Sequence, residues 1–147
     1  MPDTTSDYVA ITRLQAAYAD VVTRRAWPEL EPLFVPDAPI HLDTVTRPVI
    51  ELTGAGRLAA FLVSALERFT FFQFVILNAV IDMDGDMAHG RMNIAELRQD
   101  HGGEWSTAFG RYDDSYRRLD GGWRFATRHY RSIARRVGTG PADVFPD

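Results

Sequence analysis

The stretch from Ala108 to Tyr130 constrains the fold more than any other part of the chain. Two runs rich in aromatic residues flank Asp120-Gly121-Gly122, and these turn residues tolerate the positive φ angles that a tight reversal requires. The segment therefore predicts a long β-hairpin.

The polar residues of this hairpin are unusual for a dry core. Side chains alternate between the two faces of a strand, so residues two apart share a face. This spacing groups Tyr112, Asp114 and Tyr116 on the first strand, and Trp123, Phe125, Thr127 and His129 on the return strand. One face of the hairpin would then combine a carboxylate, an imidazole and phenols among aromatic walls, which is typical of a small-molecule pocket.

Three helices are expected before the hairpin. The first begins at Ser6 or Asp7, either of which can cap it, and runs to about Arg25, because apolar residues recur at spacings of three and four. The second is a short helix opened by Trp27-Pro28, since proline is tolerated in a first turn. The third opens at Thr53-Gly54 and keeps helical spacing almost without exception.

Strand patterns dominate the rest of the chain. The predicted strands cover residues 40–45, 49–52, 71–83, 87–98, 105–119 and 123–135. Helices followed by an antiparallel meander indicate an α+β fold in which the helices cover one face of a bent sheet. Both parities of residues 71–77 are apolar, so the other face is expected to be covered too, most simply by a second subunit in a homodimer.

Composition excludes several classes of function. A length of 147 residues with 46% hydrophobic content suits one domain over residues 1–147, whose glycine- and proline-rich end, residues 136–147, is expected to be loose or to cover an opening. The net charge of −4 gives no reason to expect nucleic acid or an anionic membrane as a partner. No basic, apolar leader or spanning segment is visible, so we expect a cytoplasmic protein.

Metal and cofactor chemistry find little support in the sequence. The chain has no cysteine, and its four histidines are scattered without metal-binding spacing. We therefore expect neither a metal site nor a cofactor.

At this point the residues resemble a known family. The features that carry the resemblance are Tyr18 in the opening helix, the run Trp27–Phe34 followed by Asp37-Ala38, Asn78 before residues 81–86, and Gly110–Asp114 leading into Asp120–Phe125. Together they resemble the SnoaL-like branch of the NTF2-like superfamily over nearly the whole chain. The resemblance implies a cone, in which three N-terminal helices pack on a strongly curved, mostly antiparallel sheet.

The resemblance also implies a range of functions on one scaffold. The superfamily includes polyketide cyclases, scytalone-type dehydratases, ketosteroid isomerases, epoxide hydrolases, small subunits of dioxygenases and non-catalytic binding modules. In its enzymes the ligand lies inside the cone, and tyrosine, aspartate or histidine side chains perform acid–base chemistry. Tyr18 is similar to the phenol of the isomerases, and Tyr112 stands where the dehydratases place an asparagine.

The chain departs from these enzymes at the positions of their bases. Val22 and Thr23 replace the tyrosine–aspartate pair of the dehydratases, Phe74 replaces a common histidine, and Leu42 replaces the isomerases' aspartate. If the protein is an enzyme, its base must come from elsewhere. The candidates are His41, Asp43, Asp114 and His129.

These residues combine into one functional hypothesis. A cofactor-independent cyclase, isomerase or dehydratase would act on a small hydrophobic, oxygenated substrate, with Asp114 or His129 removing a proton and Tyr18 and Tyr112 stabilising the oxyanion. The candidate binding residues are Trp27, His41, Asp43, Phe74, Asn78, Tyr116 and Trp123.

Each assignment has a structural alternative. Asp114 can pair with Arg111, Arg117, Arg118 or Arg128 and merely orient the sheet. A bulge that shifts the strand by one residue would turn His129 toward a subunit interface. The whole chain can equally be a binding or accessory homodimer, or a protein like the small subunit of a dioxygenase, with a larger metal-carrying partner.

Overall fold

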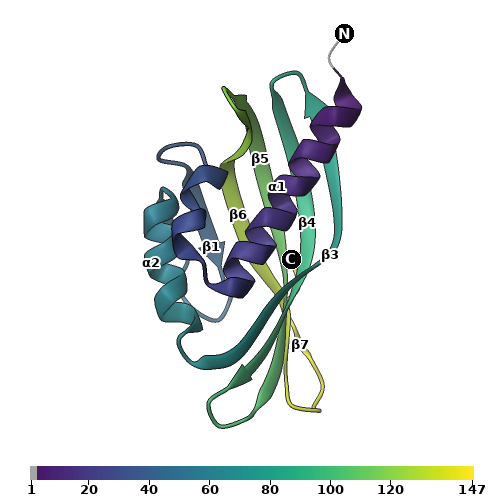
Figure 1. The fold of residues 1–147 in the computed structure, drawn as a ribbon. Helices are drawn as coiled ribbons and strands as arrows, with labels where there is room; N and C mark the ends of the chain where they lie inside the picture. Colours follow the sequence, from purple (N-terminus) through teal and green to yellow (C-terminus); the bar gives the residue numbers. More distant parts are fainter. Residues whose placement is uncertain (1–2) are drawn as a thin grey trace.

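The computed structural model describes residues 3–147, and its long strands form a bent sheet crossed by a helix (Figure 1). The helices are α1 (Thr4–Arg24), the 3-10 turns η1 (Trp27–Glu29) and η2 (Glu31–Leu33), and α2 (Ala55–Leu66). The strands are β1 (Pro39–Asp43), β2 (Ile50–Thr53), β3 (Phe69–Asp84), β4 (Met87–Asp100), β5 (Trp105–Leu119), β6 (Gly122–Val137) and β7 (Asp143–Val144). The predicted α+β class is confirmed.

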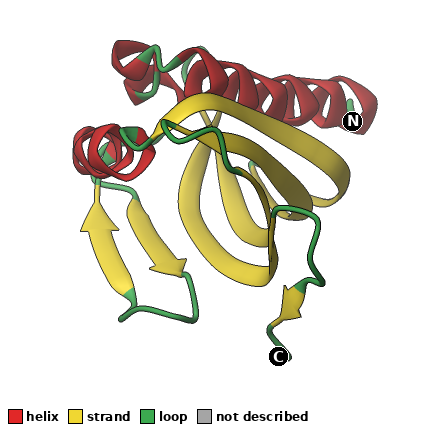
Figure 2. Ribbon diagram, turned by 90° about the horizontal axis from the view of Figure 1, so that it is seen from below, coloured by secondary structure: helices red, strands yellow, loops and turns green. Residues whose placement is uncertain are grey.

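All strands belong to one mixed sheet. Its order is β2-β1-β6-β5-β4-β3, and β7 pairs with β6 beside this path. Only the pairing of β1 with β6 is parallel among the described strands. Seen from below, the long strands curl under α1, so the sheet has a concave face toward the helices and a convex outer face (Figure 2).

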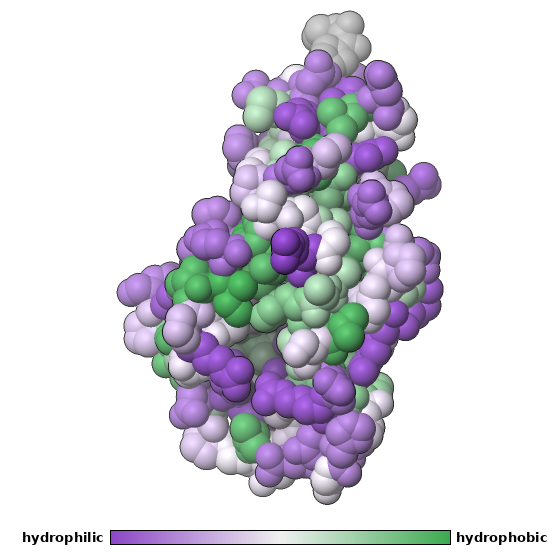
Figure 3. All heavy atoms as spheres, turned by 90° about the vertical axis from the view of Figure 1, so that its left-hand side faces the viewer, coloured by the Kyte–Doolittle hydropathy of each residue, from purple (hydrophilic) through white to green (hydrophobic). Residues whose placement is uncertain are grey.

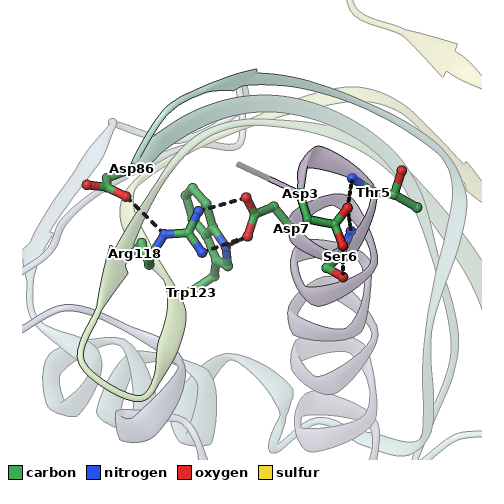
Figure 4. A network of polar contacts seen from close by, with 7 residues as sticks. All are labelled: Asp3, Thr5, Ser6, Asp7, Asp86, Arg118 and Trp123. Atoms are coloured by element: carbon green, nitrogen blue, oxygen red, sulfur yellow. Dashed lines mark hydrogen bonds and ion pairs between the residues drawn. The ribbon is translucent and has the colours of Figure 1, made fainter. Parts of the chain in front are cut away.

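Helix α1 is capped earlier than predicted. The side chain of Asp3, not Ser6 or Asp7, accepts hydrogen bonds from the backbone N–H groups of Thr5 and Ser6. This leaves the Asp7 carboxylate free to accept bonds from Arg118 and from the indole of Trp123 (Figure 4). The first turn of α1 is thereby tied to the β5–β6 hairpin.

The predicted short second helix is replaced by two 3-10 turns. Pro28 and Pro32 each stand in the first positions of one turn. Because Pro32 has no N–H to donate, a continuous α-helix through both turns would lose a hydrogen bond. The tighter turns place Leu30 and Phe34 in the core.

A bulge in the predicted hairpin changes which side chains face inward. Tyr116 pairs with Phe125, but Ser115 pairs with Thr127, so Ala126 is an extra residue on β6. Between this bulge and a second one at Ile133 the parity of β6 is reversed, so Arg128 is buried whereas His129 is exposed. The prediction that His129 shares a face with Trp123 and Phe125 is therefore wrong.

The core lies between α1 and the concave face. Tyr18 of α1 is buried there among rings from the other elements, with Phe34, Phe74, Tyr112 and Phe125 all within 6.2 Å between ring centroids. Aromatic rings in such edge-to-face contacts add to the free energy of burial.

The C-terminal residues run along β6. Val144 pairs with Ala134, and Asp147 accepts a hydrogen bond from Arg111. The carbonyl of Pro146 accepts a further bond from Arg131. Across residues 3–147, no helix has the length and apolar character needed to cross a bilayer.

Candidate functional site

Strand pairing arranges the inward side chains of β5 and β6 in rows. From the upper end of the cone in Figure 1, where the β5–β6 turn lies, the paired residues are Tyr116 with Phe125, Asp114 with Arg128, Tyr112 with Tyr130, and Ala108 with Arg135. On β4, Glu96 lies next to Ala108, and Arg98 lies next to Ser106. The concave face is thus aromatic above and charged toward the β4–β5 turn below.

Asp114 and Arg128 form a buried ion pair in the middle of this face. Arg128 donates from Nε and Nη2 to the two carboxylate oxygens at 3.0 and 3.1 Å, and Tyr116 donates to the same carboxylate at 3.4 Å. The exposed fractions of Asp114 and Arg128 are 4% and 1%. This is the pairing that the structural alternative for Asp114 predicts.

Aromatic rings enclose the guanidinium of this pair. Its central carbon lies 3.8 Å from the ring centroid of Tyr112, 4.1 Å from that of Tyr18 and 4.3 Å from that of Phe125. Such cation–π contacts are strongest where water is excluded. The Nη1 atom of Arg128 is buried and has no hydrogen-bond partner among the described residues.

Burial and mutual attraction shift the pKa of both members of the pair. Burial raises the pKa of Asp114, although Arg128 and Tyr116 oppose the shift. Burial also acts to lower the pKa of Arg128, but the adjacent Asp114 more than reverses that effect and raises it. Since both oxygens of Asp114 already accept hydrogen bonds, the geometry favours a role in joining β5 to β6.

Tyr18 and Tyr112 are brought together as predicted. Their ring centroids are 6.1 Å apart, and Phe74 contacts both rings. Burial raises the pKa of Tyr18 and holds that of Tyr112 well above its usual value. Both phenols are therefore neutral near physiological pH and are available as hydrogen-bond donors.

Glu96 is a candidate acid–base group that the sequence reasoning missed. Its side chain is 20% exposed and points to the concave face, where the Nη1 atom of Arg98 lies 3.7 Å from a carboxylate oxygen. Burial raises the pKa of Glu96, although Arg98, Arg135 and Arg68 lower it. The signal was present in the alternation of Met92, Ile94, Glu96 and Arg98 along one strand.

Tyr130 lies between Glu96 and the aromatic core. Its ring is 5.0 Å from that of Tyr112, and its hydroxyl accepts a hydrogen bond from Ser132. The ring covers Gly110 so closely that a Cβ at this position would overlap it, which gives the glycine a packing role. Burial and the nearby Glu96 raise the pKa of Tyr130.

Several predicted site residues lie outside the cone. On β1, Ile40 and Leu42 are buried, so His41 and Asp43 point outward by strand parity. The rings of His41 and His129 stack at 4.8 Å on that outer side. The prediction that these three residues face the pocket is wrong, because β1 and β6 present their other face to the core.

The remaining candidates are distributed around the core. Asn78 is exposed beside the β3 bulge and accepts a hydrogen bond from Asn93. Trp123 is buried at the upper end, where it donates to Asp7, and Trp27 packs on the rim of the core. Phe74 and Tyr116 lie inside the cone.

The surface is hollowed on the α2 side (Figure 3). A cleft of about 590 Å³ runs between η2, the loop before α2 and the upper part of β6, and its wall includes Phe34, Arg57 and Arg124. Figure 3 also shows this side hollowed in its lower half, between apolar atoms and hydrophilic side chains. Within residues 3–147, no cluster of three or more His, Cys, Asp or Glu residues suits a metal ion.

Comparison with known proteins identifies the family. The SnoaL-like domain matches residues 3–129. No curated protein matches the chain.

Solved structures resemble the whole fold. A proposed scytalone dehydratase from Novosphingobium aromaticivorans DSM 12444 has a TM-score of 0.80 at 20% identity, covering 96% of this chain and 93% of that one. A hexachlorocyclohexane dehydrochlorinase, LinA-type3 from Novosphingobium barchaimii LL02, has a TM-score of 0.80 at 21% identity, covering 98% of both chains. A proposed dehydratase of the NTF2-like family from Streptomyces avermitilis has a TM-score of 0.73 at 18% identity, over 88% of this chain and 98% of that one. The predicted NTF2-like fold is confirmed.

Proposed function

The chain belongs to the SnoaL-like domain family, and we propose that it is a cofactor-independent acid–base enzyme of the cyclase, isomerase or dehydratase type. Its substrate would be a small hydrophobic molecule with a carbonyl or hydroxyl group, bound on the concave face of the sheet. The dehydratase and dehydrochlorinase among the similar structures are named for eliminations, reactions in which carbon also loses a proton.

The environment of Glu96 carries this proposal. A carboxyl group that is enclosed, raised in pKa and still partly exposed has the properties of a general base or acid. Asp114 lacks a free carboxylate oxygen for this role, because Arg128 donates a hydrogen bond to each of its two oxygens. We therefore assign proton removal to Glu96 in place of the sequence candidates Asp114 and His129.

The tyrosines supply the complementary part of the site. Burial is the main cause of the raised pKa of Tyr18, Tyr112 and Tyr130, and the charge of Glu96 raises it further. Neutral phenols donate hydrogen bonds to the oxyanion that forms when a carbon next to a carbonyl loses its proton. Phe74 forms an apolar wall beside two of these rings.

Hydrogen exchange from solvent tests the proposal without a known substrate. The protein is incubated in deuterated buffer with a panel of small bicyclic ketones and β-hydroxy ketones, and deuterium uptake next to the carbonyl is measured by NMR. We expect exchange by the wild type and a loss of about a hundredfold or more in Glu96→Gln, as for removal of a general base. Glu104→Gln, which changes an exposed acid on the β4–β5 turn, is the matched control.

Equal exchange by the wild type and Glu96→Gln would remove Glu96 from the mechanism. A second candidate function, binding of an apolar ligand without chemistry, is favoured by the ion pair with Arg128, which engages both oxygens of the Asp114 carboxylate. Binding of a panel compound with no deuterium uptake above the buffer rate would support this alternative.

We also propose that the convex face forms a homodimer. Val75, Ala95, Phe109 and Ala134 lie side by side across β3, β4, β5 and β6 on this face. Leu77 and Leu97 next to this row are 54% and 38% exposed. A second copy would remove this apolar surface from water.

A further inference from the structure

We propose that the lower end of the cone is an anion-binding subsite, in which Arg98 and Arg135, with Arg68 at the rim, bind a carboxylate or phosphate group of the substrate. This inference rests on the proposed function, because the anion would belong to the molecule on which Glu96 acts. The substrate class is then a small aromatic or alicyclic acid or phosphate ester.

The three arginines converge from separate elements. Arg98 and Arg135 lie in neighbouring rows of the concave face, and only the small Ala108 separates Arg135 from Glu96 across the sheet. Arg68 follows α2, and its guanidinium carbon lies 4.7 Å from the ring centroid of Phe69. The guanidinium carbon of Arg98 lies 4.9 Å from the same ring, so both cations contact Phe69.

The local charges do not balance. Glu96 is the carboxylate that faces these guanidinium groups, and it approaches Arg98 only to 3.7 Å. Asp100, the next acid along β4, uses one carboxylate oxygen on the backbone N–H groups of Gly102 and Glu104. This excess of positive charge stands out in a chain whose net charge is −4.

Part of this positive charge is buried without a partner. Arg98 is 6% exposed, and its Nε donates to Ser106. The Nε of Arg135 is buried and has no hydrogen-bond partner in the part of the chain that the structure describes. A buried cation is costly without an opposite charge, and a buried donor is costly without an acceptor. An anionic ligand would supply both the charge and the acceptor.

The titration behaviour of Arg98 agrees with this geometry. Burial lowers the pKa of Arg98, and the charges of Arg135 and Arg68 lower it further, against the opposing effect of Glu96. A bound anion would offset the repulsion among the three cations. Planar guanidinium groups also match carboxylate and phosphate oxygens in a two-bond geometry.

The apolar surroundings indicate the rest of the ligand. Phe69, Phe72 and Phe74 are buried along β3 beside the cluster, and the ring of Tyr130 lies across from them on β6. An anion attached to a ring or short apolar body would thus place its charge on the arginines and its carbon skeleton under Glu96 and the phenols. Free inorganic anions would use only the charged part of such a subsite.

Calorimetric titration with benzoate, phenyl phosphate and the neutral benzamide tests the inference without turnover. We expect either anion to bind at least about tenfold more tightly than benzamide, because only the anions form charge-assisted hydrogen bonds with the arginines. Arg135→Gln should remove this preference. Arg136→Gln, an adjacent substitution whose side chain donates to Thr139 at the surface, should leave it within about twofold.

Each result either supports or overturns the inference. The relative affinities of benzoate and phenyl phosphate decide between carboxylate and phosphate as the bound group. Benzamide binding as tightly as both anions, or Arg135→Gln and Arg136→Gln behaving alike, would overturn it. Glu96→Gln should tighten anion binding because a competing negative charge is removed. The same variant should lose deuterium exchange, so the two proposals are tested independently.

Discussion

Arg128 donates two hydrogen bonds to the carboxylate of Asp114, and both side chains are almost fully buried. Removing one partner leaves the other charge buried and uncompensated, which costs more than the pair itself contributes. We expect Arg128→Met to lower the free energy of unfolding by about 3–5 kcal/mol. The double variant Arg128→Met/Asp114→Leu should recover most of that loss, because no buried charge then remains.

Chemical denaturation of the wild type, both single variants and the double variant measures this coupling. Additive losses in the double variant would show that the two side chains act independently, contrary to the geometry. The same experiment separates the structural role of Asp114 from catalysis. Deuterium uptake by a folded double variant would confirm that proton removal does not require Asp114.

The face of the sheet on which a residue lies was predictable from the sequence wherever simple alternation along the strand held. The grouping of Tyr112, Asp114 and Tyr116 needed only period-two alternation, and all three are buried on the concave face. The grouping failed for His129, because an extra residue at Ala126 reverses the parity of β6 until a second extra residue, Ile133, restores it. No residue in that run is a glycine or proline that would have marked the bulge.

At the scale of elements, one carboxylate joins α1 to the hairpin of β5 and β6. Asp7 receives two hydrogen bonds from Arg118 at 2.7 Å and one from the indole of Trp123 at 3.0 Å, as drawn in Figure 4. The hydrogen bonds from Arg118, and then that from Trp123, lower the pKa of Asp7 below its ordinary value of 3.8. A lowered pKa in the folded state stabilises the fold above the ordinary value, and this stabilisation is lost as the pH falls through the folded value.

We therefore expect Asp7→Asn to be less stable than the wild type near neutral pH. The difference should shrink as the pH falls below 3.8, where the wild-type carboxylate also becomes protonated. Denaturant titrations at neutral and acidic pH measure it, with Asp82→Asn on the exposed side of β3 as the control. A difference that does not change with pH would show that the contact is not electrostatic.

The elements themselves were largely readable from the sequence. Apolar spacing identified α1 and α2, and the turns at Asp84-Gly85 and Asp120-Gly121 separated the long strands within a few residues of their observed ends. The type of helix after Trp27 was harder to predict, because proline permits an α-helical first turn as well as a 3-10 turn. The role of Asp7 was missed because a carboxylate near a helix start reads as a cap.

At the scale of the whole molecule, the sequence led to the cone but not to the chemistry on its inner surface. The family pattern is concentrated in the hairpin, whereas Glu96 and Arg98 belong to the preceding strand, where alternation along β4 turns them inward. Their proximity to Arg68 and Arg135 joins elements far apart in the chain. Spacing within one segment cannot reveal such a cluster.

The convex face supplies the last prediction. Its apolar row crosses four strands, and an exposed leucine, Leu77, lies beside it at the β3 bulge. If this face joins two copies, sedimentation should give twice the chain mass of 16.6 kDa for the wild type. Leu77→Glu should give the single mass, because the interface would bury an unpaired charge.

Val63→Glu is the matched control for this experiment. Val63 is 51% exposed, close to the 54% of Leu77, but it lies on α2, away from the convex face. The control separates loss of a specific interface from a general effect of added charge on association. A monomeric wild type, or equal dissociation by both variants, would contradict the dimer, whereas an intact Val63→Glu dimer and a monomeric Leu77→Glu chain would place the second copy on the sheet.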